Sequence, residues 1–275
     1  MDALENCAHM ADSDPENGNL RGTGILIINA DDWGRNRETT DRIYDCVRRK
    51  TVSSVSAMVF MEDSERGAAQ ALEHNVDAGL HLNFTTPFSA PSVSERLTKH
   101  QQRVTAYLKR WRLNQAIFHP GLTSSFRYVA EAQLDEYARL FGAPPARLDG
   151  HHHMHLCANA LFGGLMPAGT IVRRNFSFRT GEKGFVNRRY RRFVDRTLAR
   201  RHRLTDFFFA LAPLEPFDRL TEILSLSRRF VVEVVTHPVA QEEYRFLTGG
   251  GFLQLVSDFP LADCYAAGPN GSARF

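Results

Sequence analysis

Residues 149–155, Asp-Gly-His-His-His-Met-His, hold the densest group of potentially reactive side chains in the sequence. Such clustering is costly without a purpose, because imidazolium charges repel one another and each buried ring needs a hydrogen-bond partner. If the segment is extended, side chains alternate, so that His151, His153 and His155 share one face. Imidazoles on one face indicate a metal site that takes further ligands from elsewhere in the chain. The alternative is a His-rich surface loop.

Two other segments could supply those ligands. Asp31 and Asp32 follow a run of apolar residues, and His81 lies in Gly-Leu-His-Leu-Asn, which ends at Asn83. Adjacent carboxylates raise each other's pKa unless a cation is present, which suggests that one binds a metal while the other takes a proton from water. The alternatives are an aspartate pair that caps a helix and a histidine that belongs to the core.

These segments share a position relative to the expected elements. Strands are expected at residues 24–29, 52–61, 76–82, 147–149, 170–172, 206–211 and 230–235, with helices between them, including 37–49, 64–74, 129–141, 187–202 and 220–228. Alternating strands and helices predict a parallel sheet with crossover helices. The aspartate pair, His81, the His-rich run and His237 all fall at expected strand ends, which meet on one face of a (β/α) barrel. We therefore expect an α/β fold of a single domain, a distorted or incomplete TIM-like barrel with parallel strands.

Composition limits the class of protein only broadly. The chain has 275 residues, of which 43% are hydrophobic and 24% charged, with a net charge of +3. These values are typical of a globular protein with a substantial core. The four cysteines are far apart and form no CxxC pair, which favours reduced thiols and a cytoplasmic location. No run reaches membrane-spanning length, and we expect residues 1–23 to form a flexible tail before a barrel domain at 24–275.

Residues 173–203 contain eleven arginines. Such a segment could bind nucleic acid or another acidic polymer. The nearby aromatic residues fit the core-facing side of a helix, and no known nucleic-acid module surrounds them. A solvated basic helix is therefore favoured, and no nucleic-acid partner is expected.

Four motifs in order resemble the YdjC-like carbohydrate deacetylases, the ChbG/HpnK family. They are Asn-Ala-Asp-Asp-Trp-Gly at 29–34, Gly-Leu-His-Leu-Asn at 79–83, the His-rich run at 149–155, and Glu-Val-Val-Thr-His-Pro at 233–238. The resemblance extends from residue 24 to near the end of the chain. At the second position of the His motif the family often has Ser, and this chain has Gly150. Two residues before His237, where the family has Ile or Met, this chain has Val235. Residues 87–125, where substrate contacts are expected, match less well.

The resemblance implies specific roles. It implies a divalent metal held by Asp32, His81 and His151, with Asp31 as the general base. It also implies a role near the site for His237, and a homodimer is compatible with it. We assign Asn83, His153 and His155 to substrate contact, and one of His153, His155 or His237 to oxyanion stabilisation or protonation of the leaving amine.

The sequence thus predicts a metal-dependent hydrolase that removes N-acetyl groups from an amino sugar, of the N-acetylglucosamine type in an oligosaccharide, glycan or glycolipid. Two imidazoles and one carboxylate favour Zn²⁺, Co²⁺ or Ni²⁺ over Mg²⁺, whereas the resemblance points to Mg²⁺, so the ion stays open. Other metal-dependent hydrolases, such as a phosphoesterase or an amidase, and a non-catalytic glycan-binding protein are the alternatives.

Overall fold

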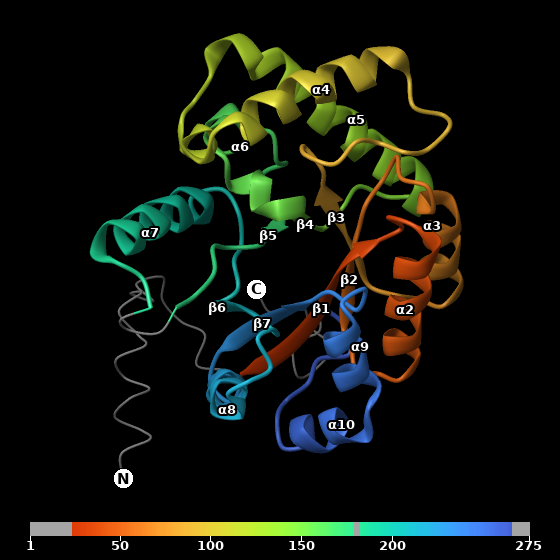
Figure 1. Cartoon of the computed structure of the whole chain (residues 1–275), viewed down its shortest axis with the longest axis vertical. Helices are drawn as coiled ribbons and strands as arrows, with labels where there is room; N and C mark the ends of the chain where they lie inside the picture. Colours follow the sequence, from red (N-terminus) through yellow and green to blue (C-terminus); the bar gives the residue numbers. More distant parts are fainter. Residues whose placement is uncertain (1–23, 179–181, 266–275) are drawn as a thin grey trace.

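Seven parallel strands form the centre of the protein in the computed structural model, which describes residues 24–178 and 182–265 (Figure 1). The expected tail at 1–23 lies outside these residues. The strands are β1 (Ile25–Trp33), β2 (Ser54–Ala57), β3 (Ala78–Leu82), β4 (Arg147–Gly150), β5 (Ile171–Val172), β6 (Phe207–Ala210) and β7 (Val231–Thr236). Apart from the first residue of β3 and of β7 and the last of β6, every strand residue is buried, as parallel strands covered on both faces should be.

The strand order shows a barrel that is open at one seam. The sheet runs β5-β4-β3-β2-β1-β7-β6, so β7 pairs with β1 and the ladder is interrupted between β5 and β6. Isolated contacts span that seam, among them the hydrogen bond from Val172 N to Arg203 O at 2.9 Å and a bridge between Ile171 and Arg203. The predicted α/β fold, an incomplete TIM-like barrel with parallel strands, is confirmed.

Helices cover the outside of the sheet. They are α2 (Arg37–Arg48), α3 (Ser64–Glu73), α4 (Glu95–Arg110), α5 (Thr123–Phe141), α6 (Ala158–Gly163), α7 (Phe185–Ala199), α8 (Phe217–Leu226), α9 (Gln241–Thr248) and α10 (Gly250–Val256), with short 3₁₀ segments η1 (Arg112–Ala116), η2 (Pro120–Leu122) and η3 (His151–Leu156). One cluster of buried apolar side chains joins the strands to most of these helices. Among the described residues, no helix combines the length and the apolar character needed to cross a membrane.

Several local expectations need correction. The strand expected at 52–61 ends at Ala57, and Phe60 has a positive φ of 59°. Within the region 87–125, where the sequence predicts a helical segment only around residues 107–113, the 16-residue helix α4 begins at Glu95, and Ser94 caps it by accepting a hydrogen bond from Leu97 N. The glycine run at 249–251, whose composition predicts a loop, contains the start of α10 at Gly250. Cap chemistry and packing of an amphipathic face therefore outweigh composition in these places.

Candidate metal centre and active site

Two consecutive carboxylates at the end of β1, those of Asp31 and Asp32, lie in one site. Consecutive side chains of a strand point to opposite faces, so a regular strand would separate Asp31 from Asp32. The pairing with β2 is irregular between Ala30 and Trp33, and Asp32 has a φ of 74°. Aspartate tolerates this left-handed conformation better than most residues, and such strain is typical of functional sites. The irregularity therefore lets both carboxylates reach the same group of histidines.

Strands β3 and β4 supply a histidine and the carboxylate that orients it. His81 and Asp149 are direct partners in the parallel ladder, and His81 Nδ1 lies 2.6 Å from Asp149 Oδ1. Since a carboxylate accepts, Nδ1 donates to Asp149, and Nε2 is the nitrogen left for a second proton or a cation. Burial lowers the pKa of His81, but the carboxylates of Asp31 and Asp149 outweigh it and raise the pKa to about 10. The negative field that favours a proton on His81 would equally favour a metal cation.

His151 reaches the same point from η3, and its segment is not extended. The run 151–156 is a 3₁₀ turn in which His152 and His153 have φ values of 54° and 58°. The expectation that His151, His153 and His155 share one face of a strand is therefore wrong. Gly150 permits the turn, because a Cβ there would lie 2.8 Å from the backbone nitrogen of His155.

Asp32, His81 and His151 converge as a set of metal ligands would. Their ligand atoms lie within 4.8 Å of one another, and all three side chains are buried. Asp32 Oδ1 is 2.9 Å from His151 Nδ1 and 3.4 Å from His81 Nε2, yet it has no hydrogen-bond partner among the described residues. Buried acceptors without partners are rare, so three converging atoms that do not bond to one another fit a divalent cation.

A buried arginine joins the carboxylates around this centre. Arg173 directly follows β5 and is 1% exposed. It donates two hydrogen bonds of 2.8 Å to Asp31 and one of 2.7 Å from Nε to Glu233, and its Nη2 lies 2.9 Å from Asp149. Burial would raise the pKa of Asp31, but Arg173 and then His81 lower it below its ordinary value. The pKa of Asp149 is lowered in the same way, against burial, first by Arg173 and then by His81.

Arg173, Asp149 and Glu233 belong to the site although the sequence patterns did not predict a separate role for any of them. Arg173 was counted with the arginine-rich segment, although it follows an expected strand as the other site residues do. Glu233 stands among valines in β7, and a charge inside an apolar strand is itself a signal of a buried partner. Its Oε2 accepts a hydrogen bond of 2.7 Å from the Tyr265 hydroxyl.

His153 and His155 lie behind the metal centre. The ring of His153 packs against Phe176 and Phe208, with centroids 4.6 and 5.7 Å away. His155 is fully buried, and its Nε2 donates to the Arg173 carbonyl at 2.9 Å. Burial lowers the pKa of His155 to about 4. His155 thus supports the backbone that carries Arg173, and we find no exposed surface on it for a ligand.

His237 lies on the open side of the site. It follows β7, its side chain is 45% exposed, and its Nε2 is 3.9 Å from Asp31 Oδ2. Its backbone nitrogen donates to Glu243 Oε2 at 3.0 Å, and the same carboxylate oxygen accepts from the Thr236 hydroxyl at 2.7 Å. His237 is therefore anchored through its backbone while its ring stays accessible beside Asp31.

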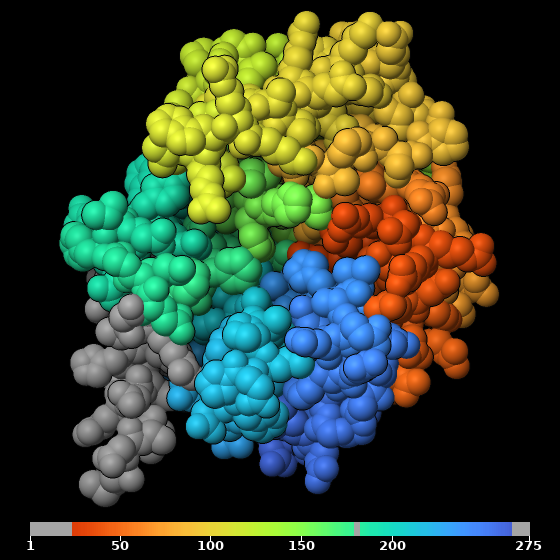
Figure 2. All heavy atoms as spheres, in the orientation of Figure 1, coloured from red at the N-terminus to blue at the C-terminus, as the bar shows by residue number. Residues whose placement is uncertain are grey.

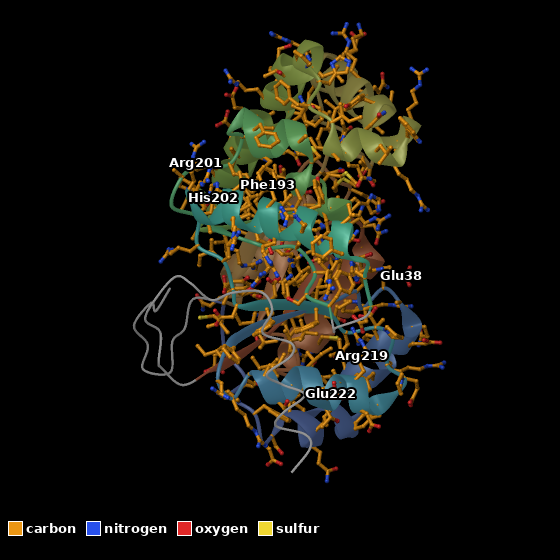
Figure 3. The ribbon with its side chains drawn as sticks, turned by 90° about the vertical axis from the view of Figure 1, so that its left-hand side faces the viewer. Glu38, Phe193, Arg201, His202, Arg219 and Glu222 are labelled. Atoms are coloured by element: carbon orange, nitrogen blue, oxygen red, sulfur yellow. The ribbon has the colours of Figure 1, made fainter. Side chains whose placement is uncertain are left out.

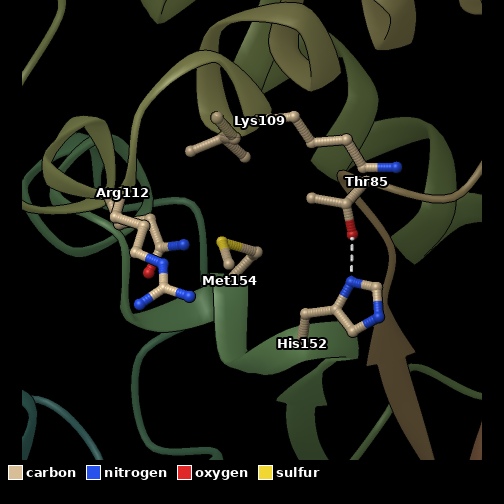
Figure 4. Close-up of a pocket in the computed structure, with 7 residues that line it drawn as sticks. Thr85, Lys109, Arg112, His152 and Met154 are labelled. Carbon is tan, nitrogen blue, oxygen red and sulfur yellow. Dashed lines mark hydrogen bonds between the residues drawn. The ribbon is translucent and has the colours of Figure 1, made fainter.

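A pocket of about 390 Å³ adjoins η3 (Figure 4). Seven residues line it: Thr85, Leu108, Lys109, Arg112, Gln115, His152 and Met154. The Thr85 hydroxyl lies 2.9 Å from His152 Nδ1, and Asn83 fixes that loop by accepting from the backbone nitrogens of Thr85 and Thr86. Figure 2 shows the green residues around 150 in the middle of this face, framed by yellow α4, teal α7 and the blue C-terminal helices.

Fold and site together define a class of protein. The protein is an open parallel (β/α) barrel, with a buried Asp-His-His group at the carboxyl ends of its strands and a second aspartate beside that group. The family described as YdjC-like protein matches residues 25–258 of the chain. The chain therefore belongs to the YdjC-like family, as its motifs predicted.

Curated relatives match part of the chain, and a solved structure shares its fold. The chain is 33% identical over 133 residues to a chitooligosaccharide deacetylase of Proteus mirabilis, covering 48% of this chain and 50% of the relative. It is 29% identical over 136 residues to one of Yersinia pestis, covering 48% and 51%. The chain thus spans about half the length of the curated relatives it matches. A structure from Enterococcus faecalis V583, described as a proposed cellobiose-phosphate cleavage protein, shares the fold with a TM-score of 0.59 at 16% identity, covering 88% of this chain and 97% of that one.

Proposed function

We propose that this protein is a divalent-metal-dependent hydrolase that removes N-acetyl groups from an amino sugar and releases acetate. The convergence of Asp32, His81 and His151, with Asp31 beside them, carries the proposal. The names of the relatives, chitooligosaccharide deacetylases, support the substrate class. A sugar of the N-acetylglucosamine type, in an oligosaccharide, a glycan or a glycolipid, is the proposed substrate, and the cytoplasm the proposed location.

The charge of the centre favours a divalent ion. The site holds four buried carboxylates, Asp31, Asp32, Asp149 and Glu233, and two buried guanidinium groups, Arg147 and Arg173. Against burial, the field of these carboxylates raises the pKa of His81 to about 10, so a divalent ion would take the place of the proton that His81 otherwise binds. Buried carboxylates without a compensating cation are strongly unfavourable, so the ion would stabilise this arrangement. Zn²⁺, Co²⁺ or Ni²⁺ suits two imidazoles and a carboxylate, and Mg²⁺ is the alternative.

Asp31 is the proposed general base. Asp32, His81 and His151 would hold the ion, which would supply Lewis-acid polarisation of the acetamide carbonyl and activation of water. Asp31 Oδ1 is occupied by Asn29 and Arg173, whereas Oδ2 accepts from Arg173 and faces both His81 and His237 at 3.9 Å. Oδ2 is thus the oxygen placed to take the proton of the attacking water. Arg173 holds the carboxylate so that this lone pair keeps its direction.

His237 is the proposed general acid. Geometry favours it over His155, which is fully buried, and over His153, whose ring is enclosed by Phe176 and Phe208. A half-exposed ring next to Asp31 can reach both solvent and the leaving nitrogen. We propose that His153 borders the site, that His155 positions Arg173, and that Asn83 acts on substrate through the Thr85 loop.

The pocket beside η3 is the proposed sugar-binding site. Thr85, Gln115 and His152 offer hydrogen-bonding groups, Leu108 and Met154 offer apolar contact, and Lys109 and Arg112 add positive charge. This mixture of a few polar groups with apolar side chains is typical of ligand pockets.

Acetate release from a panel of N-acetylated mono- and oligosaccharides tests the proposal. Release should stop when a chelator removes the metal and return when one divalent ion is restored. A parallel panel of nitrophenyl phosphates and simple amides tests the alternative hydrolases. Saccharide binding without turnover of any compound, in metal-loaded protein, would favour a glycan-binding protein instead.

A further inference from the structure

The outer surface of η1, α6 and α7 combines exposed apolar side chains with positive charge. Nine of the thirteen large apolar side chains exposed on the described part of the chain lie within residues 111–118, at Phe162 or within 185–193. Trp111 is 60% exposed, Phe185 65% and Val186 80%. We call the exposed apolar and basic side chains of residues 109–118, Phe162 and 185–193 the basic–apolar surface.

This surface is continuous. The helix α6 contacts both η1 and α7, and the rings of Phe162 and Phe193 are 6.4 Å apart. Figure 3 looks onto this side and shows Phe193 in the half of the molecule opposite Arg219 and Glu222 of α8. Exposed apolar patches of this kind mark interaction sites in most proteins.

Its charge is almost entirely positive. Residues 96–130 contain seven Lys or Arg and no Asp or Glu. Residues 183–203 contain nine Lys or Arg and one acid, Asp195, whose carboxylate pairs with Arg174 at 3.0 Å. On α7 basic and apolar side chains are interspersed, and the Arg189 guanidinium lies 5.7 Å from the ring of Phe185. Whatever covers this surface must present both negative charge and an apolar layer.

We propose that the basic–apolar surface docks the protein on an anionic lipid bilayer. A helix with aromatic and aliphatic side chains among arginines lies in the interface plane, where the apolar groups enter the acyl boundary and the arginines pair with phosphate. A nucleic acid would match the charge and could stack on the aromatic rings, but it would leave the aliphatic Val186, Leu113 and Ile117 in water, whereas a bilayer takes up both kinds of apolar side chain. A second copy of this chain would bring the arginines of two α7 helices together, because a two-fold interface joins the same patch to itself.

Docking there would place the bilayer beside the opening of the pocket. The segment η1 contributes Arg112 and Gln115 to the pocket and presents Leu113, with Trp111 just before it, to the outside. The pocket and the basic–apolar surface thus meet at η1, and Lys109 and Arg112 belong to both.

Flotation with lipid vesicles tests this inference independently of any enzymatic activity. The full-length protein should float with vesicles of equimolar phosphatidylcholine and phosphatidylglycerol, but not with phosphatidylcholine alone, and added salt should weaken binding. The double variant Phe185→Ser/Arg189→Glu should bind the mixed vesicles more than about tenfold less tightly, because each basic residue near the surface accounts for about fivefold. Trp111→Ser, on η1, should weaken binding as well.

A matched control makes the same substitutions on another face. Leu253→Ser/Arg245→Glu changes exposed side chains of α10 and α9 and should retain wild-type binding. Equal binding by the two double variants, or no binding of wild-type protein to mixed vesicles at low salt, would overturn the inference. It would also be overturned by a wild-type dimer that Phe185→Ser/Arg189→Glu converts to a monomer in light scattering, or by RNA binding that this variant loses while vesicles are never bound.

Discussion

Asp31 and Arg173 form a bidentate ion pair inside the protein, with both Nη–Oδ distances at 2.8 Å. The two residues lie 142 positions apart, one at the end of β1 and the other directly after β5. Their pairing ties the first strand to the edge of the sheet where the barrel is open. It also fixes the plane of the carboxylate that we propose as the general base.

Replacement of Arg173 by methionine should destabilise the protein strongly. The substitution leaves three carboxylates buried without their shared partner, and breaking a buried ion pair costs about 3–5 kcal/mol. Urea unfolding of Arg173→Met measures this loss. Arg66→Met is the control, since Arg66 pairs with Asp63 and Asp41 at a partly exposed site where ion pairs contribute about 1 kcal/mol or less.

Arg173→Lys separates charge from geometry. It keeps the positive charge but cannot donate two parallel hydrogen bonds to Asp31. We expect it to be more stable than Arg173→Met and still to lose kcat, because Asp31 is no longer held in place. Wild-type kcat in Arg173→Lys would show that the bidentate geometry has no role in positioning Asp31.

Asp32→Ala should abolish tight binding of a divalent ion. Asp32 Oδ1 approaches both His151 and His81 and has no hydrogen-bond partner within residues 24–178 and 182–265. Titration calorimetry with Zn²⁺ and Mn²⁺ measures the change, and Asp45→Ala, which removes a carboxylate paired with Arg49 on α2, should bind as the wild type does. Unchanged affinity in Asp32→Ala would place the ion elsewhere.

Asp31→Asn should lose turnover while it retains metal. A positioned general base contributes about 10²–10⁴-fold to rate, and asparagine keeps the size of the side chain without its basicity. Acetate release and calorimetry on the same preparation give both values. Loss of metal together with activity would instead make Asp31 a ligand, in the second buried group that it forms with His81 and Asp149.

The barrel and the family could be predicted from sequence because they depend on local patterns. Buried strands are apolar runs in the sequence, and reactive residues at the carboxyl ends of those runs indicated that they share one face of the barrel. The seam between β5 and β6 could not be predicted in this way, because β5 is only two residues long and its neighbours are chosen by packing across the whole sheet.

The geometry of the site was harder to predict from the sequence, because it depends on irregular backbone. Asp31 and Asp32 act together only because β1 is irregular there, and the turn at His151 depends on two left-handed residues after Gly150. Periodicity assumes regular backbone and fails where function requires strain. The sequence did not predict the role of Arg173, because this buried residue lies at the start of a segment with many other arginines.

Alanine in place of Arg112 should weaken substrate binding more than it slows chemistry. Arg112 lines the proposed sugar pocket and is not part of the Asp-His-His group, so it can contribute to binding without touching the reacting amide. We expect KM to rise several-fold with kcat nearly unchanged. Arg110→Ala, two residues earlier on α4 and not among the residues that line the pocket, is the control.

Stability should fall between neutral and mildly acidic pH, in part through His155. Its pKa in the folded protein is about 4, because burial disfavours the charged ring, against about 6.5 in an unfolded chain. Between these values the unfolded chain binds a proton that the folded protein does not. The stabilisation is therefore complete above pH ~6.5 and falls by about 1.4 kcal/mol per pH unit as the pH drops towards ~4.

Urea unfolding at pH 7 and pH 5 tests this directly. Wild-type protein should lose about 2 kcal/mol more than His155→Gln over that interval, because glutamine can still donate to the Arg173 carbonyl but does not titrate. His74→Gln, at the exposed end of α3, should follow the wild type. Parallel curves for wild type and His155→Gln would mean that burial does not lower the pKa of His155 in the folded protein, although its Nε2 would donate to the Arg173 carbonyl in either charge state.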